Sequence, residues 1–316
     1  MQLEYLKTKK PDKDEYSKIL FTGLDNAGKT SILLALEREF SKIANVSPTR
    51  GAQRKVFEFL GKNISEWDLG GQKLYRISYI RNPSKYFDNT EIALYIIDIQ
   101  DKQRIPEAIS YLEDVISKFS ELNIKPPIYI LFHKFDPALE KNALNEYTEL
   151  IINLKEDIKK GTNYPRLYFY RTSIHEIENL VLIMSDIFRT LIDRPEAINN
   201  TLKEFSLKEQ CDGICLIDNN SLIIGSYYSS KKVEDLLKKA PPYFLRMNDR
   251  FDQIEKSINV KHKFLDNRIT VQRKTYYFIF QQIRNDPPYY ILLARKSPLF
   301  NHETIKSLGT FLESFI

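Results

Sequence analysis

The stretch Gly23-Leu24-Asp25-Asn26-Ala27-Gly28-Lys29-Thr30 decides the fold of this chain. It reads G-x-x-x-x-G-K-T, and it follows the apolar run 19–22 and precedes a helical pattern. Glycines let a backbone wrap closely around an anion, while successive N–H groups and the positive end of the following helix face that anion. The pattern therefore predicts a phosphate-binding loop between a strand and a helix.

Two side chains of this loop have defined chemistry in such a site. Lys29 can place a positive charge near the β- and γ-phosphates of a nucleoside triphosphate, and the Thr30 hydroxyl can bind Mg²⁺. An ordinary glycine-containing turn before a helix is the alternative, but all four fixed positions and both flanks fit the phosphate loop. The residues expected around the phosphates are Gly23, Asp25, Asn26, Ala27, Gly28, Lys29, Thr30 and Ser31.

The composition is that of a globular protein with room for two domains. The chain has 316 residues, of which 42% are hydrophobic and 28% charged, and single cores rarely grow past ~250 residues. The 47 basic and 42 acidic residues are interspersed and leave a net charge of +5, so we expect no nucleic-acid partner. Cys211 and Cys215 are interpreted as buried thiols of a reduced protein, because a zinc site needs more ligands nearby.

Membrane and export signals are not visible in the sequence. No apolar run approaches the ~20 residues of a membrane span, and Met1 is followed by charged residues rather than an apolar stretch. We therefore expect a cytoplasmic protein whose contact with a membrane is at most peripheral, through partners.

The order of elements predicts an α/β fold. Strand-like and helical patterns alternate over residues 17–194, which predicts a mostly parallel sheet with helices on both faces. Pro195 indicates a boundary, after which 195–316 reads as a small α/β domain with a helix, two strands, a helical region, further strands and a terminal helix. Residues 1–16 form an N-terminal tail. The expected strands are 18–22, 54–59, 63–68, 92–99, 127–133, 167–171, 213–217, 222–227, 275–282 and 289–294. The expected helices are 29–43, 106–121, 143–160, 176–191, 196–207, the region 231–256 with a break near Pro241-Pro242, and 302–315.

A second motif, Trp67-Asp68-Leu69-Gly70-Gly71-Gln72, ends a predicted strand. Asp68 there can hold Mg²⁺ opposite Thr30, and Gln72 can orient an attacking water. The Gly71 N–H can contact a γ-phosphate and be released when that phosphate leaves. Thr49, in the loop between the two motifs, is the expected second hydroxyl ligand of Mg²⁺.

A third motif, His133-Lys134-Phe135-Asp136, follows another strand. A carboxylate at Asp136 can accept hydrogen bonds from the N1–H and the exocyclic amine of guanine together, a donor pair that adenine lacks. The stem of Lys134 can cover the base plane. After the next strand, Ser173 and Ile174 lie where a backbone N–H can meet the guanine O6.

Together these motifs resemble those of the Ras superfamily, and within it the Rag and Arf branches. The phosphate loop, Pro48-Thr49 and the W-D-L-G-G-Q motif are similar to Arf proteins, whereas His133-Lys134-x-Asp136 and Arg171-Thr172-Ser173-Ile174 are similar to Rag GTPases. The resemblance implies a small GTPase that binds GTP or GDP with Mg²⁺ and slowly converts GTP to GDP and phosphate. Gln72, Lys29 and Thr49 are then the expected catalytic residues.

The resemblance also implies partners. Rag GTPases carry a roadblock-type domain through which two GTPases pair, so residues 195–316 are expected to form a roadblock or longin-like domain for a homo- or heterodimer. Neither Arg50 nor Arg76 is expected to act as an arginine finger in cis, so GTPase-activating and exchange proteins are expected regulators. The alternative function is a nucleotide-stabilised scaffold with little or no hydrolysis.

Overall fold

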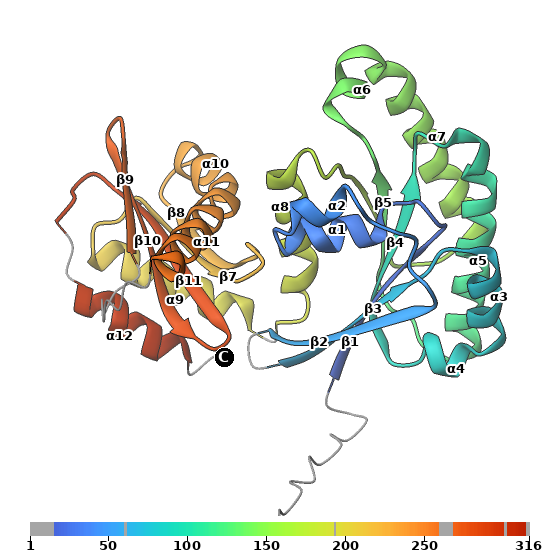
Figure 1. The fold of residues 1–316 in the computed structure, drawn as a ribbon, viewed down its shortest axis with the longest axis horizontal. Coiled ribbons are helices and arrows are strands. Elements are labelled where there is room, and N and C mark those ends of the chain that lie inside the picture. Colours follow the sequence, from blue (N-terminus) through green and yellow to red (C-terminus); the bar gives the residue numbers. More distant parts are fainter. Residues whose placement is uncertain (1–15, 60–61, 193, 259–267, 300–301, 314–316) are drawn as a thin grey trace, which may run out of the picture.

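The computed structural model describes residues 16–59, 62–192, 194–258, 268–299 and 302–313. These residues form two β-sheets, each covered by its own helices (Figure 1). We call the six-stranded sheet with helices α1 to α8 the first unit, and the five-stranded sheet with helices α9 to α12 the second unit.

The sheet of the first unit has the strand order β2-β3-β1-β4-β5-β6. Strands β3, β1, β4, β5 and β6 are parallel, and β2 is an antiparallel edge strand paired with β3. The carboxyl ends of the parallel strands therefore meet at one edge, where ligands of open α/β sheets bind. The strands are β1 Tyr16–Gly23, β2 Ala52–Phe59, β3 Lys62–Leu69, β4 Thr90–Asp98, β5 Ile128–His133 and β6 Leu167–Arg171.

Helices cover both faces of this sheet, and the alternation of side chains along each strand explains why. Ile19 and Phe21 of β1 pack with α1 and α8 on one face, whereas Leu20 packs with α3, α5 and α7 on the other. The helices are α1 Lys29–Leu36, α2 Phe40–Ile43, α3 Lys73–Arg81, α4 Pro83–Tyr86, the 3₁₀ turn η1 Lys102–Arg104, α5 Ile105–Glu121, α6 Pro137–Asn142, α7 Leu144–Thr162 and α8 Ile177–Arg189.

The sheet of the second unit is antiparallel, in the order β8-β7-β11-β10-β9. Helices α9 and α12 pack on one face, and α10 and α11 on the other. The elements are α9 Pro195–Lys208, β7 Gly213–Asp218, β8 Ile223–Tyr228, α10 Lys231–Lys239, α11 Pro241–Ser257, β9 Arg268–Arg273, β10 Tyr276–Asn285, β11 Pro288–Arg295 and α12 His302–Glu313.

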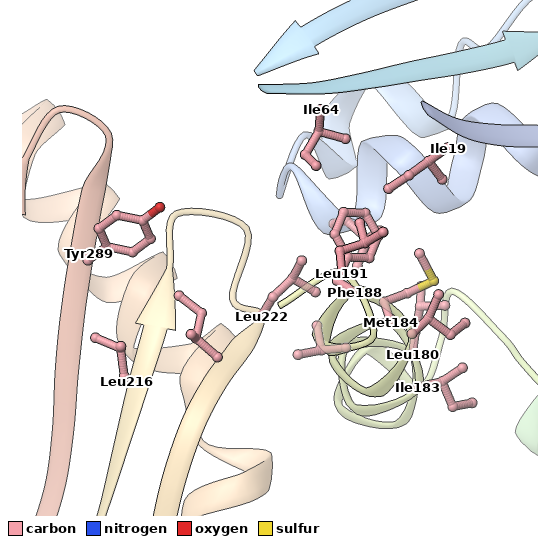
Figure 2. Close-up of a cluster of buried hydrophobic side chains, with 14 of the residues drawn as sticks. Ile19, Ile64, Leu180, Ile183, Met184, Phe188, Leu191, Leu216, Leu222 and Tyr289 are labelled. Atoms are coloured by element: carbon pink, nitrogen blue, oxygen red, sulfur yellow. The ribbon is translucent and has the colours of Figure 1, made fainter. Parts of the chain in front are cut away.

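A continuous hydrophobic core joins the two units. Leu222, just before β8, belongs to the same buried cluster as Phe188 and Leu191 at the end of α8, and Figure 2 shows these side chains near one another. At the surface, Arg38 at the end of α1 donates from Nε to a carboxylate oxygen of Asp249 on α11, at 2.7 Å. The boundary predicted at Pro195 coincides with the start of α9, but it stays a prediction as a domain boundary.

The elements agree with the predicted fold class and differ from the predictions in detail. The helix predicted over 29–43 is interrupted between α1 and α2, where Arg38 adopts a left-handed backbone with φ of 59°. That conformation ends the helix, and it accompanies the contact of Arg38 with the second unit. Strand β9 and helices α3, α4 and α6 were not predicted.

Candidate functional site

The phosphate loop lies where the sequence places it, between β1 and α1. Gly28 has φ of 97°, a conformation that favours glycine, and a Cβ built there would lie 2.4 Å from the His133 ring. The loop therefore packs directly on the third motif, which requires glycine at this position. Asn26 is exposed, whereas Ala27 is buried.

Lys29 is buried, with 5% of its surface exposed. Its ammonium group donates to the carbonyl oxygens of Leu24 at 2.7 Å and Gly23 at 3.2 Å. Burial lowers the pKa of Lys29 to about 8, although the carboxylates of Asp68 and Asp25 oppose the change. A phosphate group beside this ammonium would favour its charged form, because opposite charges raise the pKa of a lysine.

Three side chains from separate segments meet beside the loop. The Thr30 hydroxyl donates to Asp68 Oδ2 at 2.7 Å, the Thr49 hydroxyl donates to the same oxygen at 3.2 Å, and the two hydroxyls lie 2.8 Å apart. The other carboxylate oxygen of Asp68 is buried and has no hydrogen-bond partner among the residues that the structure describes. A buried, unpartnered carboxylate oxygen next to two hydroxyls fits a hard cation such as Mg²⁺.

Protein side chains alone do not complete a metal site here. Across the part of the chain that the structure describes, no group of three or more His, Cys, Asp or Glu side chains is arranged to hold a metal ion. A cation at Thr30, Thr49 and Asp68 would therefore take further ligands from phosphate or water, as Mg²⁺ does when it binds with a nucleotide.

The second motif packs against the phosphate loop. A Cβ built on Gly71 would lie 2.0 Å from the backbone nitrogen of Asp25, so only glycine allows this approach. Gln72 directly precedes α3 and is half-buried. A cavity of about 250 Å³ is bordered by the phosphate loop, the Thr49 loop and this motif, and its lining includes Asp25, Asn26, Gly28, Lys29, Thr30, Ser31, Thr49, Gly71 and Gln72.

Asp136 of the third motif follows β5 and contacts Ser173, which follows the neighbouring strand β6. The Ser173 hydroxyl donates to Asp136 Oδ1 at 2.5 Å, and the Gln100 amide donates to Asp136 Oδ2 at 3.0 Å. Lys134 forms an ion pair with Asp98 at 2.7 Å. The Asp136 carboxylate is thus already oriented by donors, which is the arrangement that a base with two adjacent N–H donors would use.

His133 is buried at the junction of three segments. Its Nδ1 lies 2.9 Å from the Thr172 hydroxyl, and the edge of its ring faces Gly28. Burial lowers the pKa of His133 to about 4, and the nearby Lys134 charge acts in the same direction. The imidazole is therefore neutral at physiological pH and connects the phosphate loop with the loops after β5 and β6.

Some predicted residues lie apart from these contacts. Ile174 is half-buried and packs against the hydrophobic core, so its role through the backbone N–H stays a prediction. Arg50 is exposed. Arg76 is buried, donates from Nε to the Gly71 carbonyl at 2.8 Å and pairs with Glu107.

Two residues at the site were missed. Gln100 orients Asp136, and Arg104 donates to the Asp25 carboxylate at 2.8 Å. Both lie in the segment after β4, which contains no recognisable motif; the only sequence signal is that β4 ends at the same edge of the sheet. Both cysteines are buried and free, as the sequence indicated.

Comparisons with known proteins show the family of this chain. A family model described as "Gtr1/RagA G protein conserved region" matches residues 18–258. ADP-ribosylation factor-like protein 3 of Chlamydomonas reinhardtii is 38% identical over 124 residues, which are 39% of this chain and 66% of that protein. ADP-ribosylation factor-like protein 2 of Drosophila melanogaster is 35% identical over 140 residues, which are 44% of this chain and 72% of that protein.

Among solved structures, the Arl6 BBS3 small GTPase of Trypanosoma brucei with bound GppNp aligns with a TM-score of 0.41 and 20% identity. The alignment covers 52% of this chain and 91% of that chain. Within the described residues, no helix has the length and apolar character needed to cross a membrane.

Proposed function

Since this chain belongs to the Gtr1/RagA family of G proteins and is a small GTPase, we propose that it works as a molecular switch that binds GTP with Mg²⁺ at the site described above. The observation that carries the proposal is the convergence of Thr30, Thr49 and Asp68 next to Lys29 and Gln72. These residues come from three separate segments, and each has the chemistry that a triphosphate site requires at its position.

Each group of residues has a separate role in nucleotide binding and hydrolysis. Lys29 and the N–H groups of the phosphate loop bind the β- and γ-phosphates, and Asp136 with Ser173 selects guanine. Thr30, Thr49 and Asp68 would hold Mg²⁺, which when bound neutralises charge on the phosphate oxygens. Gln72 orients the attacking water.

The switch lies in the contacts of Thr49 and Gly71. Both belong to loops that border the cavity beside Lys29. With GTP bound, Thr49 would be held by Mg²⁺ and Gly71 by the γ-phosphate, and the loss of that phosphate would release both loops.

Intrinsic hydrolysis is expected to be slow, because the nearby arginines are engaged elsewhere. Arg76 is bound to Gly71 and Glu107, and Arg104 is bound to Asp25 and Glu107. An activating protein would supply a positive charge for the transition state, and an exchange protein would speed the release of GDP.

The second unit is proposed to pair with the same unit of another GTPase or with a roadblock protein. Its order of helix, two strands, helices, three strands and helix fits a roadblock-type domain, with a longin-like variant as the alternative. Among the described residues, β9 is an edge strand of the sheet, and an edge strand can add a strand from another chain. On α11, Tyr243, Phe251 and Ile254 are exposed at helical spacing.

A truncation tests the assembly. Removing residues 195–316 should keep guanine-nucleotide binding and convert the dimer into a monomer, as judged by light scattering against the mass of the shortened chain. Phe251→Asp in the full chain should likewise give a monomer, whereas Asp235→Asn on exposed α10 should not. An oligomeric state that stays unchanged in both the truncated protein and the Phe251 variant would remove the role in pairing. A cytoplasmic location, with membrane contact only through such partners, is part of the same proposal.

Equilibrium titration tests the nucleotide site itself. GTP and GDP should bind in the presence of Mg²⁺ while ATP does not, and Lys29→Asn should abolish GTP binding. Equal affinity for GTP and ATP would contradict the role of Asp136. Tight GTP binding without hydrolysis would favour the alternative function, a nucleotide-stabilised scaffold.

A further inference from the structure

Arg104, the last residue of the 3₁₀ turn η1 that follows β4, contacts the phosphate loop. Arg104 Nη2 donates to Asp25 Oδ1 at 2.8 Å, Nη1 approaches the Asp25 carbonyl oxygen at 3.4 Å, and Nε donates to Glu107 at 3.0 Å. The guanidinium thus binds both the side chain and the backbone of one loop residue. An arginine can do this because its five N–H donors form a rigid fork.

Asp25 needs such a partner because of where it lies. It is the third residue of the phosphate loop and lines the same cavity as Lys29 and Thr30. Partial burial would raise the pKa of Asp25, but the hydrogen bond and charge of Arg104 outweigh it and hold that pKa below its usual range. The loop therefore carries a charged carboxylate where a negatively charged ligand binds.

The contacts of Arg104 continue to the second motif. Glu107 is shared between Arg104 and Arg76, and Arg76 holds the Gly71 carbonyl oxygen at 2.8 Å. Gly71 in turn packs against the backbone nitrogen of Asp25. Asp25, Arg104, Glu107, Arg76 and Gly71 thus form a closed ring of contacts beside the cavity that Asp25 and Gly71 line.

We propose that Arg104 is a positioning residue that lets this site favour GTP over GDP. Its ion pair neutralises the Asp25 carboxylate, which would otherwise repel the additional negative charge of the γ-phosphate. Through Glu107 and Arg76, it also holds Gly71 in place for its N–H to meet that phosphate. The proposal rests on the proposed placement of the triphosphate in the cavity beside Lys29.

A purely structural role for the Arg104–Asp25 ion pair predicts a different result. Arg104 and Asp25 keep 33% and 37% of their side-chain surfaces exposed, and ion pairs as exposed as this contribute little to stability. If the pair were only structural, its loss would change the binding of GTP and GDP by the same small factor. The ratio of the two affinities therefore separates the explanations.

The test compares GTP and GDP affinities of the full chain by titration in Mg²⁺. Arg104→Ala should lower the affinity for GTP relative to GDP on the order of ten-fold, because the exposed charge of Asp25 then acts on the γ-phosphate. Arg104→Lys, which keeps the charge but loses the fork, should lower it less. The matched control is Lys102→Ala, which removes a charge from the same turn and breaks the exposed pair with Glu146 and the contact with the Tyr147 ring, neither of which involves the phosphate loop.

The double variant Asp25→Ala/Arg104→Ala decides the mechanism. With the carboxylate gone, no negative charge at position 25 remains to repel the γ-phosphate, so the GTP-to-GDP affinity ratio should rise well above that of Arg104→Ala alone. It should stay below the wild-type ratio, because the link from Arg104 through Glu107 and Arg76 to Gly71 is still missing. An unchanged ratio in Arg104→Ala, or a double variant no better than the single one, would overturn the inference. If the wild-type protein itself failed to bind GTP in preference to ATP, the proposed function would fail instead, so the two failures are distinguishable.

Discussion

The hydroxyl oxygens of Thr30 and Thr49 lie 2.8 Å apart, although Thr30 is in the first turn of α1 and Thr49 lies in the loop before β2. Both hydroxyls also contact one carboxylate oxygen of Asp68 at the end of β3. Polar groups from three segments gather in this way when they share a ligand, and the unpartnered second oxygen of Asp68 indicates a cation.

Thr49→Val should weaken the binding of GTP with Mg²⁺ by about ten-fold and leave GDP binding nearly unchanged, because Thr49 is expected to reach the cation only while the γ-phosphate holds its loop. Titration with each nucleotide measures both effects. The matched control is Thr201→Val on α9, whose hydroxyl bonds only the Ala197 carbonyl. Equal loss for GTP and GDP would show that Thr49 is not specific for the triphosphate state.

Gln72→Leu should leave GTP affinity intact and slow hydrolysis by roughly ten-fold or more, since leucine fills similar space but cannot orient water. Single-turnover hydrolysis at saturating GTP measures this rate. Gln53→Leu, at an exposed position of β2, serves as the control. Unchanged turnover in the Gln72 variant would assign that side chain a structural role.

Asp136→Asn should reduce GTP affinity on the order of 100-fold or more, because the amide offers a donor where guanine also offers donors. The variant should gain affinity for xanthosine triphosphate, whose base carries an oxygen in place of the exocyclic amine. Competition binding compares the two nucleotides, with Asp157→Asn on α7 as the control. A variant that still preferred GTP would show that Asp136 does not read the base.

His133→Asn should reduce the pH dependence of stability. The pKa of His133 is lowered by burial to about 4 in the folded protein, against about 6.5 for an unfolded histidine. The folded state thus binds the proton less readily, so the contribution of His133 is complete above pH 6.5 and is lost as the pH falls toward 4. An amide does not titrate in this range.

Urea unfolding at pH 7 and pH 5 measures that difference. The wild type should lose about 2 kcal/mol more of its free energy of unfolding than the variant over this interval. His175→Asn, at an exposed histidine, should behave as the wild type does. Parallel losses in the wild type and the His133 variant would mean that the pKa of His133 is the same in the folded and the unfolded protein.

The sequence predicted most of the first unit because its strands are short apolar runs that end in motifs. Lys29, Thr30 and Asp68 lie next to strand ends, and the carboxyl ends of parallel strands share one edge of a sheet. Their meeting therefore followed from the order of strands. The helix predicted over 29–43 was wrong only in being continuous across 37–39, because the break at Arg38 accompanies a contact with Asp249, 211 residues away.

The contacts of Arg104 and Gln100 could not be predicted from the sequence, for a related reason. Neither belongs to a motif, and their partners Asp25 and Asp136 are far away along the chain. Strand β9 was missed because its alternating residues, such as Arg268, Thr270 and Gln272, are polar on one face and resemble a loop. Periodicity detects buried faces better than exposed edges.

Single-turnover hydrolysis of GTP with Mg²⁺, with ATP measured in parallel, tests the central claim most directly. The account predicts slow conversion of GTP to GDP and phosphate, slowed further by Gln72→Leu, and no cleavage of ATP. Equal cleavage of both nucleotides would contradict a guanine-specific switch. Tight GTP binding with no cleavage over hours would contradict the role of this site in hydrolysis.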